Sequence, residues 1–228
     1  LALFQALHPT SELSSEKWEA FLSKMDSKFQ RKGKSIEFIR YAFQNAHKKL
    51  FKKYKQHATF NEMLAEGNFD CVSGTAVLGM ILDRYDFDFE IIETDYHVFS
   101  LVNFEKGPII LESTLPVGGM ITTPTEVHNY LSAYQPEIKT QRFPLNQAIA
   151  GQAVDDSDNS TFRVISLKEL AGLQYYNDAI VHFNKQAYGK AIEQLSKAYL
   201  LYPSDRIDGL RALSMDLAYK SYGYDLRK

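Results

Sequence analysis

The chain has 228 residues, of which 45% are hydrophobic and 24% are charged, and its formal net charge is −2. This composition is typical of a soluble globular protein and argues against a disordered chain and a membrane bundle. No stretch approaches the roughly 20 apolar residues that a spanning helix needs. A slightly negative chain is also unsuited to general binding of nucleic acid.

The chain begins at Leu1 rather than at Met, and its first seven residues are mostly apolar. This start is what remains when a signal segment is removed, and it equally fits a boundary inside a longer chain. The first alternative leads us to expect an extracytoplasmic protein. The single cysteine leaves the redox compartment open, because it allows no internal disulfide.

Two amphipathic helices are predicted in the first quarter of the chain. Apolar residues recur at helical spacing over residues 11–30, Gly33 ends this helix, and the spacing resumes over residues 35–54. The second helix ends in a basic cluster over residues 48–55. We expect its lysines to form a solvated face, with an anionic ligand site as the alternative.

The only cysteine stands where the next helix should begin. Cys71 follows Asp70 and precedes an apolar run that predicts a buried helix over residues 71–85. The positive end of the helix dipole stabilises a thiolate, so this position favours a reactive nucleophile. Asp70 can cap the helix, but its negative charge opposes a thiolate. A lone cysteine otherwise serves as a small buried hydrophobe.

The apolar period then changes from helical to alternating, which predicts an antiparallel sheet. The expected strands cover residues 88–93, 97–104 and 109–113, joined by short connections. His97 opens the second strand, and Glu112 lies within the third. An unpaired buried carboxylate costs several kcal/mol, so Glu112 requires a partner. His97 on the neighbouring strand is the natural one.

A cysteine at a helix start, then a histidine at a strand start, then an acidic residue before Ser or Thr resembles the transglutaminase-like branch of the papain-like cysteine enzymes. The resemblance spans roughly residues 60 to 118. It implies an α+β core in which the cysteine helix packs on a small antiparallel sheet. Cys71 matches the nucleophile, His97 the base, and Glu112 the position that is usually Asp. Phe99 falls where the family often has Trp.

The resemblance implies a cysteine-dependent acyl-transfer enzyme that needs no metal or other cofactor. Its substrate would be a peptide or protein. Cys71 would attack an acyl carbon, His97 would donate a proton to the leaving amine, and Glu112 would orient the imidazole. The thioester could then pass to water or to an amine. The Cys71 backbone N–H would be one oxyanion donor, with Asn68 or Asn61 as candidates for the second.

Two alternatives belong to other functional classes. The replacement of Asp by Glu favours a transglutaminase-like module without turnover, which would serve in binding or scaffolding. Alternatively, Cys71, His97, Asp95 and Glu112 would bind zinc, although no Cys-x-x-Cys or His-x-x-x-His pair supports such a site. No phosphate loop, dinucleotide fingerprint or Gly-x-Ser-x-Gly elbow is present.

The last third of the chain is predicted to be helical. The pair Thr123-Pro124 starts one helix, with Glu126 placed for a capping box. Residues 151–162 are polar, and we predict a linker or loop over residues 151–165, between a domain of residues 1–150 and a helical segment of residues 166–228.

That helical segment resembles a tetratricopeptide repeat closed by Tyr202-Pro203. The residues that carry the resemblance are Tyr175, Ala179, Phe183, Tyr188, Ala191, Ile192, Leu195, Ala198 and Tyr199. Small residues are needed where the paired helices approach, and three alanines supply them. One repeat offers little concave surface, so we expect the segment to lean on the first domain. A protein partner at the repeat is the further role that the resemblance implies.

Overall fold

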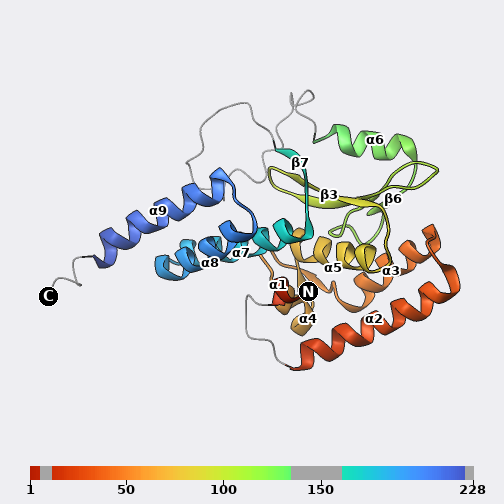
Figure 1. The fold of residues 1–228 in the computed structure, drawn as a ribbon, viewed down its shortest axis with the longest axis horizontal. Helices are drawn as coiled ribbons and strands as arrows, with labels where there is room; N and C mark the ends of the chain where they lie inside the picture. Colours follow the sequence, from red (N-terminus) through yellow and green to blue (C-terminus); the bar gives the residue numbers. More distant parts are fainter. Residues whose placement is uncertain (6–11, 135–160, 224–228) are drawn as a thin grey trace.

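The computed structural model of the protein describes residues 1–5, 12–134 and 161–223, which fold into an α+β structure (Figure 1). The helices are α1 (Ala2–Gln5), α2 (Glu12–Lys32), α3 (Ile36–Lys49), α4 (Phe60–Glu66), α5 (Cys71–Arg84), α6 (Pro124–Ser132), α7 (Leu167–Asn184), α8 (Tyr188–Leu201) and α9 (Asp205–Tyr222). The strands are β1 (Lys53–Tyr54), β2 (Asn68–Phe69), β3 (Phe89–Thr94), β4 (Val98–Val102), β5 (Ile109–Leu111), β6 (Met120–Ile121) and β7 (Phe162–Ile165). The predicted α+β class is confirmed. The papain-like core and the tetratricopeptide repeat stay predictions.

Strands β3 to β7 form one antiparallel sheet in the order β6-β5-β4-β3-β7, and β1 and β2 form a separate parallel pair. β4 pairs with β5, so the two strands predicted to be neighbours are neighbours. Each strand is shorter than predicted. His97 lies directly before β4, and Glu112 lies directly after β5. Because β4 and β5 are antiparallel, the start of β4 and the end of β5 lie side by side, so His97 and Glu112 lie at the same end of the hairpin; we call this end the sheet edge.

Helices cover both faces of this sheet, because its side chains alternate between two apolar clusters. Side chains on the first face join the main core beside α5, and they are Ile91, Val98, Val102, Ile109 and Leu111. Side chains on the second face pack against Val127 of α6, and they are Ile92, Phe99 and Ile110. Figure 1 shows α5 and α6 on opposite sides of the sheet. The sheet edge at His97 and Glu112 is therefore reached by both helices.

Three predicted boundaries are wrong. The helix predicted over residues 35–54 ends at Lys49, and the chain then pairs as β1. Leu50 and Phe51 are both buried, and two consecutive buried residues fit an extended segment better than an amphipathic helix that buries one face. The predicted sheet ends with the strand over residues 109–113, whereas a further strand, β6, follows the paired glycines 118–119 and pairs with β5.

The third correction concerns the predicted linker over residues 151–165. Its last four residues form β7, which pairs with β3 at the edge of the sheet. Phe162 packs against the cluster below α6, and Ile165 joins the main core. Phe162 and Ile165 face opposite sides of the sheet. A strand of four residues after a polar stretch gives too short an apolar pattern to be predicted from the sequence. Residues 151–160 lie outside the described residues.

The C-terminal helices pack as expected for paired helices. α7 lies along α8, and α9 continues the stack (Figure 1). The three alanines predicted at the close approach, Ala179, Ala191 and Ala198, are fully buried. At Gly172 an added Cβ would lie 2.6 Å from the Cβ of Tyr202, so this approach requires glycine. No described helix combines the length and apolar character that crossing a membrane requires.

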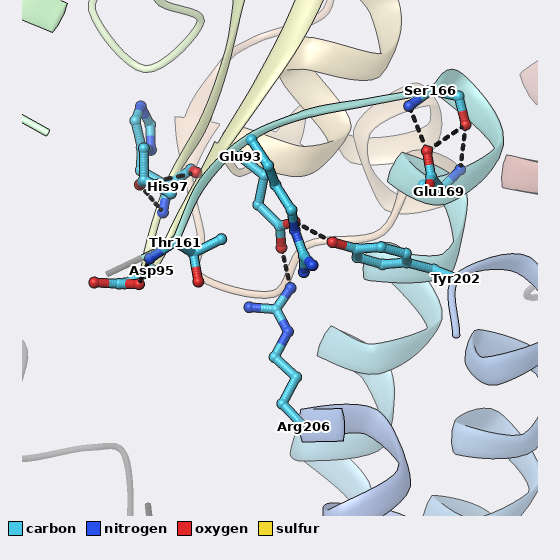
Figure 2. A network of polar contacts seen from close by, with 10 residues as sticks. Glu93, Asp95, His97, Thr161, Ser166, Glu169, Tyr202 and Arg206 are labelled. Carbon is cyan, nitrogen blue, oxygen red and sulfur yellow. Dashed lines mark hydrogen bonds and ion pairs between the residues drawn. The ribbon is translucent and has the colours of Figure 1, made fainter. Parts of the chain in front are cut away.

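The helical segment leans on the rest of the protein, as the sequence led us to expect. α7 packs against α5. Buried Gln174 of α7 accepts a hydrogen bond from the Phe60 N–H (2.7 Å) and donates one to the Phe4 carbonyl (2.9 Å). A second link joins Glu93 of β3 to Tyr202 and Arg206 of the helical segment (Figure 2).

Candidate active site

The hairpin of β4 and β5 brings together the two residues that the sequence pairs. His97 Nε2 makes a short hydrogen bond with Glu112 Oε2. Glu112 is 2% exposed, whereas the His97 side chain is 18% exposed. The predicted partnership is therefore present, and the second ring nitrogen of His97 is the one left to serve a substrate or a thiol.

Glu112 is held by donors on both carboxylate oxygens. Oε1 accepts hydrogen bonds from the Thr114 backbone N–H (2.8 Å) and from Thr114 Oγ1 (2.6 Å). Oε2, which His97 contacts, also accepts one from the Tyr130 hydroxyl. Burial by itself raises the pKa of Glu112, but the His97, Thr114 and Tyr130 contacts outweigh it and lower that pKa to about 2. Glu112 is thus an ionised acceptor at neutral pH.

Cys71 is the first residue of α5, as the sequence predicts. Asp70 is its N-cap: the Ser73 N–H donates to Asp70 Oδ1 (2.8 Å), and the Asp70 N–H donates to Ser73 Oγ (2.9 Å). Thr75 Oγ1 donates to the Val98 carbonyl (3.2 Å), which ties the second turn of α5 to the start of β4. The Cys71 thiol thereby lies within hydrogen-bonding reach of the Val98 backbone, one residue after His97.

A second close approach fixes α5 against the segment that follows β5. An added Cβ at Gly74 would lie 2.6 Å from Ser113 Oγ and 2.7 Å from Ser113 Cβ. Ser113 is the residue after Glu112 and is completely buried. The small residues after Cys71 therefore admit another layer of the protein. They bring the cysteine helix and the Glu112 segment together.

The electrostatics of Cys71 differ from the expectation of a stabilised thiolate. Burial raises the pKa of the Cys71 thiol strongly, and the negative charges of Asp70 and Glu112 act in the same direction. The hydrogen bond from the Val98 backbone opposes them without prevailing. Burial of the sulfur is the larger cause and outweighs the helix dipole, and the anionic N-cap Asp70 adds to its effect. Cys71 is thus a neutral thiol in this structure.

The other contacts and positions predicted for the site differ from the expectation. Within the described part of the chain, no hydrogen bond joins Cys71 to the His97 ring. Asn68, a candidate oxyanion donor, donates to Glu66 Oε2 (2.7 Å), and Asn61 lies on α4. Phe99 is fully buried beneath the rings of α6, with its ring centroid 6.2 Å from that of His97. It supports the histidine from within the core.

Two aromatic residues were missed by the sequence reasoning, Tyr130 on α6 and Tyr134 just after it. Tyr130 reaches Glu112, and the Tyr134 ring stacks on His97 at 6.2 Å between centroids. Together with Val127 and Leu131 they follow the i, i+3, i+4, i+7 spacing of an inward helix face. This spacing is the signal that would have placed them against the sheet edge where His97 and Glu112 lie.

Metal binding finds no support in the part of the chain that the structure describes. No three His, Cys, Asp or Glu residues there form a group that could hold an ion. The four candidate zinc ligands, which are Cys71, Asp95, His97 and Glu112, therefore do not form such a group. Asp95 instead accepts a hydrogen bond from the Thr161 N–H (2.5 Å). Comparison with known proteins finds no matching family model, no similar curated protein and no similar solved structure.

Proposed function

We propose that the protein is a cysteine-dependent acyl-transfer enzyme of the transglutaminase-like type, acting on peptide or protein amides. Cys71 is the nucleophile, His97 the general base and acid, and Glu112 the residue that orients the imidazole. The observation that carries this proposal is the buried His97–Glu112 pair at the sheet edge that the Cys71 helix reaches. An ionised, fully hydrogen-bonded carboxylate on an imidazole is the arrangement that general-base catalysis needs.

The raised pKa of Cys71 decides how such a reaction begins. A neutral thiol must lose its proton as it attacks, so His97 takes the proton while the sulfur–carbon bond forms. The resulting imidazolium is stabilised by Glu112. It then returns the proton to the leaving amine as the carbon–nitrogen bond breaks, which leaves a thioester. Water or an amine attacks this thioester in the second half of the reaction, with His97 again accepting the proton.

The helix start offers one donor for the developing oxyanion. Asp70 accepts hydrogen bonds from the N–H groups of Val72 and Ser73, which lie in the first turn of α5. The Cys71 N–H lies outside this cap, at the positive end of the helix. It is therefore the group that we assign to the substrate oxygen.

An activated acyl ester tests the proposal without knowledge of the natural substrate. Incubation with p-nitrophenyl acetate should acetylate Cys71, and intact-mass and peptide mapping should locate the adduct. Cys71→Ala should abolish it. His97→Ala should slow acetylation by about 100-fold through loss of the general base. His128→Ala removes an exposed histidine of α6 and serves as the matched control.

Acetylation no faster than that of a free thiol at the same pH, and indifferent to His97→Ala, would overturn the enzyme proposal. The scaffold alternative would then lead: a transglutaminase-like binding module with its helical repeat. The observation that favours this alternative is the neutral, raised-pKa thiol of Cys71. The same experiment therefore separates the two functions.

A further inference from the structure

A tyrosine from the opposite face of the sheet contacts the carboxylate of the candidate triad. Tyr130 lies on α6, whereas Cys71 begins α5 on the other face (Figure 1). Its hydroxyl donates to Glu112 Oε2, the oxygen that also contacts His97 Nε2. Because Thr114 occupies Oε1, Tyr130 completes the set of donors around the carboxylate.

Packing fixes the position of this hydroxyl. The Tyr130 ring meets Phe99 edge-on at 5.1 Å between centroids, and it lies 5.3 Å from the Tyr134 ring. Burial and the charge of Glu112 raise the pKa of the Tyr130 hydroxyl far above its ordinary value. The group therefore stays protonated and acts as a donor to the carboxylate at every working pH.

We propose that Tyr130 is a positioning residue, whose hydroxyl holds Glu112 Oε2 in place against His97. This inference rests on the proposed function and explains how Glu serves at a position where Asp is usual. Glu carries one more methylene and one more rotatable bond than Asp, so its carboxylate needs more restraint. Thr114 restrains Oε1, and Tyr130 restrains the oxygen that orients the imidazole.

Several other titratable groups lie within electrostatic reach of Glu112. They are His47 of α3, Tyr54 of β1, Cys71 of α5 and Tyr134 after α6. Among the hydrogen bonds of the described residues, Oε2 receives its contacts from His97 and Tyr130. Removal of the Tyr130 hydroxyl is therefore the cleanest change at this oxygen.

Tyr130→Phe keeps the ring and removes the hydroxyl. Acetylation of Cys71 by p-nitrophenyl acetate should slow by about tenfold, because the carboxylate no longer holds one orientation. The pKa of Glu112 should also rise from about 2, since one of its three stabilising contacts is lost. Carbon-13 NMR of the glutamate carboxyl groups follows this titration, with Glu112→Gln used to assign the signal.

Tyr96→Phe is the matched control, because Tyr96 precedes His97 in sequence but is 71% exposed. It should change neither the rate nor the titration of Glu112. An unchanged rate and an unchanged Glu112 titration in folded Tyr130→Phe would overturn the positioning role. A slow Tyr130→Ala beside a normal Tyr130→Phe would do so as well, since the ring alone would then matter.

The two readouts separate this inference from the proposed function. If wild-type Cys71 is not acetylated, the enzyme proposal fails, while the Glu112 titration in Tyr130→Phe still shows whether the hydroxyl restrains the carboxylate. If acetylation depends on His97 but not on the Tyr130 hydroxyl, the enzyme proposal stands and the positioning role falls.

Discussion

Two glutamates of the central sheet are almost completely buried, Glu93 at 1% exposure and Glu112 at 2%. Each carboxylate is contacted by a tyrosine hydroxyl and by a nitrogen-bearing side chain, which is arginine at Glu93 and histidine at Glu112. Glu93 binds Arg163 Nε (2.8 Å), the Arg206 guanidinium and the Tyr202 hydroxyl (Figure 2). Glu112 is contacted by Thr114, which lies 2 residues away along the chain, and by His97 and Tyr130, which lie 15 and 18 residues away.

The nature of the nitrogen partner separates the two sites. A guanidinium is always charged in proteins, so Arg163 and Arg206 act as fixed counter-charges to Glu93. An imidazole changes charge near neutral pH, so a carboxylate that orients it can serve proton transfer. Glu93 also joins β3 to β7, α8 and α9, whereas Glu112 lies beside the helix of Cys71. Burial of a carboxylate alone therefore says little about function; the partner decides.

The largest effect should come from breaking the Glu93 group. Glu93→Gln leaves the exposed Arg163 and the half-buried Arg206 without their counter-charge, and it removes the charge from a carboxylate that is itself buried. We expect the free energy of unfolding to fall by about 2–4 kcal/mol, as measured by urea denaturation. Acetylation of Cys71 in the folded protein should keep its rate. A folded Glu93→Gln variant of normal stability whose Cys71 is acetylated more slowly would show that Glu93 belongs to the candidate site.

The same exchange at Glu112 should slow the acetylation of Cys71, which the exchange at Glu93 should leave unchanged. Glu112→Gln removes the charge that stabilises the His97 imidazolium, so acetylation of Cys71 should slow by about 100-fold. The free energy of unfolding should fall as well, because the contacts that lower the pKa of Glu112 stabilise its ionised form, although Thr114 can still donate to the amide oxygen. Equal effects of the two Gln variants on rate and stability would remove the distinction between the two sites.

Contact between α5 and the segment after Glu112 should give a smaller effect. Gly74→Ala places a methyl group against Ser113, at distances that real contacts do not show. The free energy of unfolding should fall by about 1–2 kcal/mol, although alanine favours helix more than glycine does. Acetylation should slow, because α5 and Cys71 shift away from the sheet edge. Gly189→Ala, at an open position on α8, is the control.

The smallest effect concerns Asp70, the residue before Cys71. Asp70→Asn keeps a good N-cap but removes a negative charge that raises the pKa of Cys71. Alkylation of Cys71 by iodoacetamide at pH 7 should become faster by roughly threefold to tenfold, since more thiolate is present. If Asp70→Asn and the wild-type protein were alkylated at the same rate at every pH from about 6 to about 9, burial alone would set the pKa of the Cys71 thiol.

Asp70 and Glu112 should also differ in their effect on stability across pH. Burial raises the pKa of Asp70 from 3.8 to about 6, so between these values the folded protein binds more protons than the unfolded chain. The contribution of Asp70 to the free energy of unfolding therefore falls as pH rises through this window. The Glu112 contribution has the opposite sign: it is present above pH 4.5 and lost as pH falls towards about 2. Asp70→Asn should abolish the first slope and leave the second.

Local patterns in the sequence determined a large part of the candidate site. The run after Cys71 and the capping residue Asp70 predicted α5, since caps and helical periodicity act over a few residues. The alternating segments and the short turn between them predicted the β4–β5 hairpin, because such a turn fixes register. That register brings His97 to Glu112, and the need to pair a buried carboxylate predicts the same contact from the sequence.

Tertiary structure alone decided the features that depend on distant segments. Glu93 receives arginines from β7 and α9, 70 and 113 residues further along the chain, and no local pattern marks them as partners. Tyr130 reaches Glu112 only because α6 covers the second face of the sheet. The raised pKa of Cys71 likewise follows from burial by packed layers, which outweighs the helix dipole that the sequence suggested. Short-range periodicity specifies elements and hairpins, whereas desolvation and charge pairing are set by which elements pack together.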